Sequence, residues 1–512
     1  MSSSDQAHKL DRYAEISELA LRVRRLLKRF MIPLLLVLGA ATGMLIFTGN
    51  PGGICFGFIS LGTLVVLFLW QSNGIGLPII PLIAVQHLIV YGLPILVRNE
   101  AITDYPPSLL FDAGFEVLVF SCCLAMSWRM AMQVFRPGKA VSYALPDFQK
   151  DGSNKLRRLG FSLITVGTLY QVLEQLDLLQ PIFDLLPSGS VSLMVPLVTG
   201  ANACGFFLIS LFVGARDLNN TGRALFWALL TLSCAISASG FLLSAATTMI
   251  GAVMIGLFWS TGKIPWRYLT VVMLLLAFFS ISKFTMRGRY WSFDEGVRPV
   301  STTLLDMPRI YLEWTEASIE AITTSDSANA PRSARPDDNH QSLLQRVNNL
   351  QNLLFAINAI QISGISPLGG GSYAIIPPLF VPRIMWPDKP RTHEGQVMLN
   401  VHFGRQDLDS TFRTYVAWGL LPEAYGNYGA FWGSFLLGCV LGISLAWLEN
   451  YTTHKLLLSL EGFVCFTVLL CMVNSFEMVA SVLLTMIYQA VIPIIFASMP
   501  FLRRMSTVRP ID

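Results

Sequence analysis

Long apolar stretches alternate with short polar ones along most of this 512-residue chain. A membrane-spanning helix needs roughly 20 mainly apolar residues, because hydrocarbon offers its backbone groups no other partner. This criterion predicts an all-α, polytopic transmembrane helix bundle with about 12 spans. The predicted spans are 31–49, 54–70, 75–97, 109–132, 158–179, 191–213, 223–242, 246–260, 268–284, 429–448, 457–474 and 478–500. The weakest is 158–179, which contains Glu174 and Asp177.

One long polar interruption separates the ninth predicted span from the tenth. Within it, apolar spacing predicts helices over 300–322 and 341–361, and the small polar residues between them favour an irregular excursion. A glycine run at 369–371 predicts a turn or hinge. The chain therefore divides into a basic amphipathic segment (1–30), nine spans (31–284), a large loop (285–428), three spans (429–500) and a tail (501–512).

Composition and charge support this organisation. Charged residues make up 13% of the chain and hydrophobic residues 53%, whereas soluble domains carry about 25% charged residues. Lysine and arginine gather before the first span, in alternate loops and in the tail, so the positive-inside rule predicts cytoplasmic termini and an external loop over 285–428. All eight cysteines fall in apolar runs, and neither a disulfide framework nor a metal-ligand spacing is visible.

The last third of the large loop concentrates side chains that can perform chemistry. Five prolines between 377 and 390 stiffen a segment that carries Arg383, Trp386, Asp388 and Lys389. Arginine presents a planar fork of donors that matches phosphate, and lysine a point charge. Further along, Glu423 lies at the predicted membrane boundary, where an ionisable residue is either structural or functional. These residues alone also fit solvated charges on an interfacial loop.

Two short motifs in this region resemble those of a known family. Val381-Pro-Arg-Ile-Met-Trp-Pro-Asp-Lys-Pro390 and Pro422-Glu-Ala-Tyr-Gly-Asn-Tyr-Gly429, the latter leading into a span, are similar to the paired motifs of oligosaccharide repeat-unit polymerases. These are the Wzy-type O-antigen and exopolysaccharide polymerases of the bacterial inner membrane. The motifs cover only residues 381–429, and the rest of the chain agrees with the family in topology alone.

The resemblance implies a metal-independent glycosyltransferase that needs no cofactor. Such an enzyme moves a growing glycan from its undecaprenyl pyrophosphate carrier onto a new lipid-linked repeat unit, on the periplasmic side of the membrane. Its implied partners are this lipid-linked oligosaccharide, membrane lipid, a chain-length regulator and a flippase, but not nucleic acid.

Residue roles follow from the same resemblance. Glu423 or Asp388 would be the general base, with His393 as second choice. Arg383 and Lys389 would stabilise the charge that develops on pyrophosphate. Arg413, or Arg287 and Arg289 from the start of the loop, would share that task, and the further substrate-binding candidates are Arg391, Trp386, Tyr425 and Asn427. The acidic stretch 405–413 has no counterpart in the family pattern, which leaves the choice of base open.

Two other functions stay open. A ligase-like transferase would move finished glycan to a terminal acceptor, and the sequence separates it poorly from a polymerase. A secondary transporter with about 12 spans is the weaker alternative, because the two halves of the chain show no paired repeat.

Overall fold

The computed structural model describes residues 16–135, 152–186, 188–241, 243–292, 298–299, 304–324, 347–381, 385–386, 388–412, 416–455, 460–473, 478–488 and 491. These residues are mostly helical, and they belong to two compact units. Unit 1 comprises residues 1–150, 347–411 and 415–512; unit 2 comprises 151–346 and 412–414. The predicted loop 285–428 is thus divided between the units.

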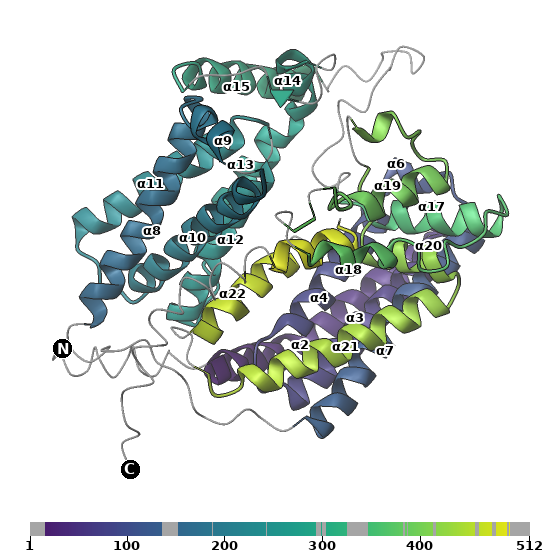
Figure 1. The fold of residues 1–512 in the computed structure, drawn as a ribbon. Coiled ribbons are helices and arrows are strands. Elements are labelled where there is room, and N and C mark those ends of the chain that lie inside the picture. Colours follow the sequence, from purple (N-terminus) through teal and green to yellow (C-terminus); the bar gives the residue numbers. More distant parts are fainter. Residues whose placement is uncertain are drawn as a thin grey trace. The chain divides into compact units, whose positions relative to one another are not determined.

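Unit 1 is built around long apolar helices that pack side by side (Figure 1). They are α2 (Ile16–Phe47), α3 (Gly53–Asn73), α7 (Pro107–Val134), α21 (Trp432–Thr452) and the shorter α22 (Leu460–Val473). α7 packs along both α3 and α21, and α2 packs against α3. The predicted span 75–97 is one continuous rod made of α4 (Ile79–His87), the π-helical turn η1 (Leu88–Gly92) and α5 (Leu93–Leu96).

Short helices complete unit 1. They are α6 (Glu100–Thr103), α17 (Leu350–Gln361), η3 (Tyr373–Ile375), α18 (Ile376–Leu379), α19 (Glu394–His402), η4 (Ser410–Phe412, whose last residue is assigned to unit 2) and α20 (Leu420–Tyr428). α17 packs against α7 and α20, and α20 packs against the start of α21. This arrangement anchors the late part of the predicted loop on the long helices.

Unit 2 contains a second group of helices. They are α8 (Gly152–Gln175), α9 (Gln180–Leu185), α10 (Ser188–Gly214), α11 (Asn220–Ala238), α12 (Leu243–Thr261), α13 (Trp266–Ile281), α14 (Lys283–Tyr290) and α15 (Met307–Thr324), with a two-residue antiparallel pairing of β1 (Trp291–Ser292) and β2 (Arg298–Pro299). α10 packs between α8 and α12. α15 lies across the ends of this group, where Trp314 packs in an aromatic cluster with Phe241 (Figure 1).

The predicted all-α class is confirmed in the described residues, together with the multi-pass membrane character. Six helices there are long and apolar enough to cross a membrane: α2, α3, the rod Ile79–Leu96, α7, α11 and α21. Three shorter apolar helices cover Val198–Gly214, Ala246–Thr261 and Trp266–Ile281. The count of about 12 spans and the external position of 285–428 stay predictions.

Candidate functional site

The second motif forms a short buried helix in unit 1. α20 starts after Gly419, with φ 95°, and ends before Gly429, with φ 75°. Both values lie in the left-handed region that only glycine adopts without strain, so the two glycines set the ends of this helix. All residues from Leu421 to Asn427 are buried, and Glu423 and Asn427 lie one turn apart on the same face.

The carboxylate of Glu423 is enclosed and held by two donors. Its side chain is 0% exposed. Oε1 accepts a hydrogen bond from Ser372 Oγ at 2.7 Å, and Oε2 accepts one from the backbone N–H of Ala480 at 2.6 Å. Ala480 is the first residue of a helical segment over 480–488, so this N–H is one of the groups that a helix start leaves without an internal partner.

Burial has the largest effect on the pKa of Glu423. It raises the pKa of this carboxyl to about 7, although the hydrogen bonds from Ala480 and Ser372 act in the opposite direction. A carboxyl with a pKa near 7 is divided between its two protonation states at neutral pH. This property is what a general base needs, and an exposed glutamate lacks it.

The glycine-rich segment 364–372 places Ser372 next to this carboxylate. The backbone N–H groups of Leu368 and Gly369 donate to the carbonyl oxygens of Gly426 and Asn427, each at 2.9 Å. These are carbonyls in the last turn of α20, so the segment caps the helix from outside. The predicted turn at 369–371 is confirmed, since Gly369 and Gly370 both have left-handed φ values.

Asn427 completes the buried polar cluster. Its Nδ2 donates to Ser372 Oγ and to the carbonyl oxygen of Glu423, both at 2.8 Å. In the described part of the chain, its buried Oδ1 has no hydrogen-bond donor. Ser372 therefore stands between an amide that donates to it and a carboxylate that accepts from it.

Three tyrosines surround the cluster. The rings of Tyr373 and Tyr428 stack with centroids 5.9 Å apart, and Tyr428 is 39% exposed. Tyr425, a predicted substrate contact, is instead fully buried, and its hydroxyl accepts a hydrogen bond from Gln361 Nε2 at 3.2 Å. Tyr428 is thus the exposed tyrosine of this group.

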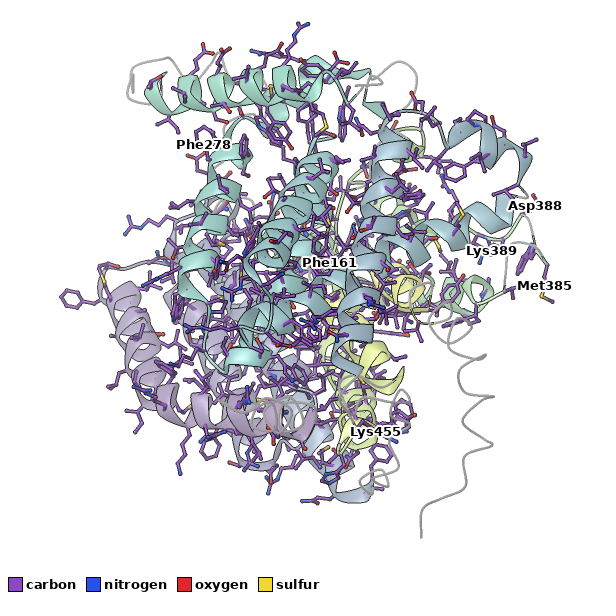
Figure 2. The ribbon with its side chains drawn as sticks, turned by 90° about the vertical axis from the view of Figure 1, so that its left-hand side faces the viewer. Phe161, Phe278, Met385, Asp388, Lys389 and Lys455 are labelled. Atoms are coloured by element: carbon purple, nitrogen blue, oxygen red, sulfur yellow. The ribbon has the colours of Figure 1, made fainter. Side chains whose placement is uncertain are left out.

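The proline-rich segment separates its charged side chains. Lys389 is buried, and its Nζ donates to the carbonyl oxygens of Leu379 at 2.8 Å and Val381 at 2.7 Å. Asp388 and Met385 lie at the outer margin of the loop, whereas Lys389 turns back toward the chain (Figure 2). Trp386 is 43% exposed. Lys389 therefore joins the end of the proline-rich segment to its beginning in this conformation.

A half-exposed ion pair follows the prolines. Arg391 Nε donates to Glu394 Oε2 at 2.9 Å. Arg391 lies three residues before Glu394, which is the first residue of α19. Next to it, burial and the positive charge of Arg391 lower the pKa of His393. A neutral imidazole beside a guanidinium offers the proton acceptor expected of a second-choice base.

The other predicted site residues are not brought to this cluster by the described structure. Arg383 and Arg413 lie outside the described residues. Arg287 and Arg289 belong to α14 of unit 2, where Arg287 donates to the carbonyl oxygen of Phe241 at 2.9 Å and lies 4.4 Å from the ring centre of Trp291. The contacts of Arg287 are those of a residue that holds the end of unit 2 together.

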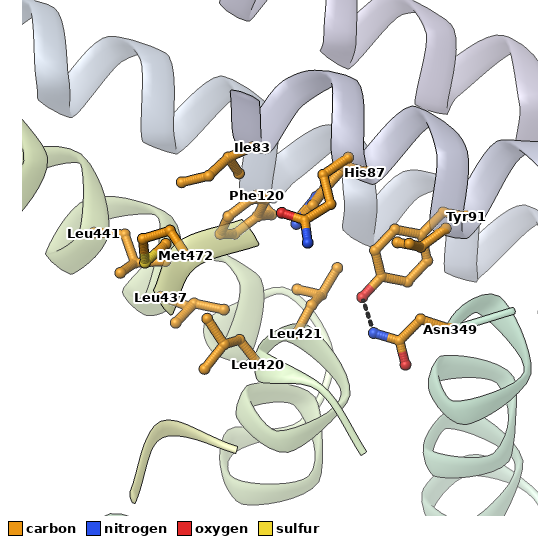
Figure 3. A pocket seen from close by; sticks show the side chains of 12 residues that line it. Ile83, His87, Tyr91, Phe120, Asn349, Leu420, Leu421, Leu437, Leu441 and Met472 are labelled. Atoms are coloured by element: carbon orange, nitrogen blue, oxygen red, sulfur yellow. Dashed lines mark hydrogen bonds between the residues drawn. The ribbon is translucent and has the colours of Figure 1, made fainter. Parts of the chain in front are cut away.

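A small cavity lies elsewhere in unit 1. It has a volume of about 20 Å³ and is lined by His87, Tyr91, Phe120 and Asn349 among others (Figure 3). Asn349 Nδ2 donates to the Tyr91 hydroxyl at 3.1 Å, and the His87 ring stacks on Phe120. This volume accommodates about one water molecule, so the cavity is not a site for a sugar or a lipid.

Sequence reasoning missed Ser372 and the Ala480 amide. Ser372 follows three glycines and carries no motif of its own, and a backbone amide has no residue signature. Arg405 was also missed: it donates to Asn352 Oδ1 at 2.8 Å and lies over the Phe355 ring, so it ties the acidic stretch to α17.

Comparison with models of protein families, with curated proteins and with solved structures finds no match for this chain. The features of the chain that bear on its function are therefore the two motifs and the geometry around Glu423.

Proposed function

We propose that this chain is a membrane glycosyltransferase that polymerises oligosaccharide repeat units carried on undecaprenyl pyrophosphate. The observation that carries the proposal is the buried Glu423, whose pKa is raised to about 7 within the motif that resembles the polymerase family. The multi-pass helices supply the membrane location that a lipid-linked substrate requires. The enzyme acts at the outer face of a bacterial inner membrane, with both termini cytoplasmic and without a metal or cofactor.

Glu423 is the general base in this proposal. It accepts the proton of the acceptor sugar hydroxyl while that oxygen bonds to the anomeric carbon of the donor, and the bond from this carbon to pyrophosphate breaks. Asp388 is a poorer base, because its exposed carboxylate lies on the outer margin of the loop. Arg391 and Arg383 stabilise the negative charge on the departing pyrophosphate. Trp386 and Tyr428 offer exposed rings to the sugars.

Access to Glu423 requires movement of the glycine-rich segment. Glu423 and Ser372 are both 0% exposed, so an acceptor hydroxyl cannot reach the carboxylate in this conformation. The left-handed glycines Gly369 and Gly370 lie three and two residues before Ser372 and allow the backbone there to move without strain. Displacement of Ser372 would open the carboxylate to the substrate.

The test is elongation of a purified lipid-linked repeat unit by the full-length protein in proteoliposomes. We expect Glu423→Gln to lower the elongation rate at least about 100-fold, the smaller end of a general-base contribution. The matched control is Glu100→Gln, which makes the same change at an exposed position on α6 and should leave the rate unchanged. In the wild type, the rate should rise with pH and level off above about 7, because Glu423 must be deprotonated.

The product distinguishes the alternatives. Wild-type elongation by Glu423→Gln, in protein with a normal melting profile, would reject Glu423 as the base. Transfer of finished glycan to a terminal acceptor, without elongation on the carrier, would identify a ligase instead. Uptake or flipping of the lipid-linked unit without any new glycosidic bond would favour a transporter.

A further inference from the structure

An open groove runs along the first half of α8 in unit 2. Its volume is about 860 Å³, and it is lined by Arg157, Arg158, Phe161 and Val166 of α8 and by Leu225 of α11, among others. Phe161 is labelled in Figure 2. Nothing in the proposed glycosyl transfer uses these residues.

Hydrogen bonds between α8 and α11 join the two helices beyond the groove. Thr168 Oγ1 and Ser233 Oγ are 2.7 Å apart, and Gln171 Nε2 donates to Ser237 Oγ at 3.1 Å. Because both partners advance along the chain in the same direction, the two helices are parallel. The groove therefore lies beside the N-terminal parts of both helices, whereas these hydrogen bonds join their C-terminal halves.

The part of the groove near the start of α8 is basic. Arg157 is held in place by donating to the carbonyl oxygen of Asp217 at 3.2 Å and to the side chain of Asn154. Arg158 is exposed and, in the described part of the chain, has no hydrogen-bond or ion-pair partner. Ser162 adds a hydroxyl one turn further along, and no carboxylate is among the groove residues. Two guanidinium groups and a hydroxyl form a suitable site for a phosphate group.

Beyond the arginines and Ser162, the groove is lined by the apolar side chains of Phe161, Val166 and Leu225, with Thr165 as a polar member. Val166 is 56% exposed and Leu225 49%, and Leu169 continues the same outward face of α8 at 52%. The polar side chains Thr168 and Gln171 instead point toward α11. Polar groups inside and apolar groups outside are the arrangement expected of a helix in contact with lipid. From Arg158 to Leu169, α8 rises roughly 16 Å, about the thickness of one hydrocarbon leaflet.

We propose that this groove binds one anionic phospholipid. Its phosphate sits between Arg157 and Arg158, and an acyl chain follows Phe161, Val166 and Leu225. The apolar floor favours a lipid over inorganic phosphate, which would leave that surface uncovered. No carboxylate lines the groove, and this favours phosphatidylglycerol over phosphatidylcholine, whose ammonium group finds no acidic partner there.

The experiment is a lipid titration of the full-length protein in detergent, followed by native mass spectrometry. The probes are phosphatidylglycerol and phosphatidylcholine with the same acyl chains. We expect one phosphatidylglycerol to bind preferentially, and the double variant Arg157→Gln/Arg158→Gln to weaken its binding roughly 30-fold, since each surface arginine contributes about a fivefold effect. Ser162→Phe, which adds a bulky ring one turn from Arg158 and keeps both charges, should weaken binding as well.

The control removes two positive charges elsewhere in unit 2. Lys263→Gln/Arg267→Gln changes exposed residues outside the groove and should bind phosphatidylglycerol like the wild type. An equal loss in this control would show a general charge effect and overturn the proposal. Equal binding of the two lipids, full binding by Ser162→Phe, or displacement of the lipid by millimolar inorganic phosphate would each overturn it as well.

Discussion

Two of the buried glutamates in unit 1 differ in the donors that surround them. Glu449 accepts four N–H groups: the indoles of Trp70 and Trp128 and the backbone amides of Ile75 and Gly76. An N–H group only donates, so this site suits a carboxylate that only accepts. Glu423 faces one amide and one hydroxyl, and a hydroxyl can accept as well as donate. Glu423 can therefore be satisfied with or without its proton, as a base must be.

The raised pKa of Glu423 predicts a pH-dependent stability. The folded-state pKa is about 7 and the ordinary value 4.5, so folding favours the protonated form. This stabilisation is fully present below pH 4.5 and is lost as pH rises through about 7; its size is on the order of 3 kcal/mol. The melting midpoint in detergent should therefore fall more steeply between pH 5 and pH 8 in the wild type than in Glu423→Gln. Glu100→Gln should keep the wild-type slope, and identical slopes in all three proteins would contradict the assignment.

The sequence predicted part of this site. Glu423 and Asn427 were identified because both belong to the motif that resembles the polymerase family, and the structure adds that they lie on one helix. Ser372 and Ala480 lie about 50 residues before and after Glu423, and only the packing of three segments brings them together. Lys389 was predicted to bind substrate, and its motif gave no sign that Nζ is bonded to two carbonyl oxygens of its own segment.

At the scale of helices, apolar periodicity located the elements better than their ends. The predicted span 31–49 is part of the longer helix α2, which covers Ile16–Phe47 and includes the basic residues that precede position 31. One of these basic residues, Arg24, donates to carbonyl oxygens at the end of α3. The π-helical turn η1 was not predicted, since the extra residue in a helical turn leaves hydropathy unchanged. Helices over 307–324 and 350–361 agree with the predictions for 300–322 and 341–361.

Glu449 joins three helices of unit 1, and its replacement tests that role. The side chain on α21 bonds to indoles on α3 and α7 and to the chain between α3 and α4. In Glu449→Gln, the amide nitrogen faces N–H groups, and at least two buried donors lose their acceptor. We expect the melting midpoint to fall by roughly 5–15 °C, at about 1–3 kcal/mol per lost partner. Glu100→Gln, an identical change at an exposed position, should melt like the wild type; an unchanged midpoint in Glu449→Gln would show that the carboxylate does not join these helices.

At the scale of the whole molecule, the predicted loop is not one structural body. Residues 285–346 belong to unit 2, and most of 347–428 belongs to unit 1. Hydropathy marks both parts as polar and cannot distinguish them, because the division depends on which helices each part packs against. The proposed chemistry lies in the unit 1 part, and α15 and its aromatic cluster give the unit 2 part a structural role.

Membrane topology decides whether this chemistry occurs outside the cytoplasm. With about 12 spans, the positive-inside rule places Asp388 and Arg289 on the external side and Arg158 on the cytoplasmic side. Single cysteines at these exposed positions, in a background without the native cysteines, should react with an impermeant maleimide accordingly: Asp388→Cys and Arg289→Cys in right-side-out vesicles, Arg158→Cys in inverted ones. Labelling of Asp388→Cys from the cytoplasmic side alone would exclude periplasmic glycan transfer at Glu423. Labelling of Asp388→Cys and Arg289→Cys from opposite sides would require an additional crossing between the two parts of the loop.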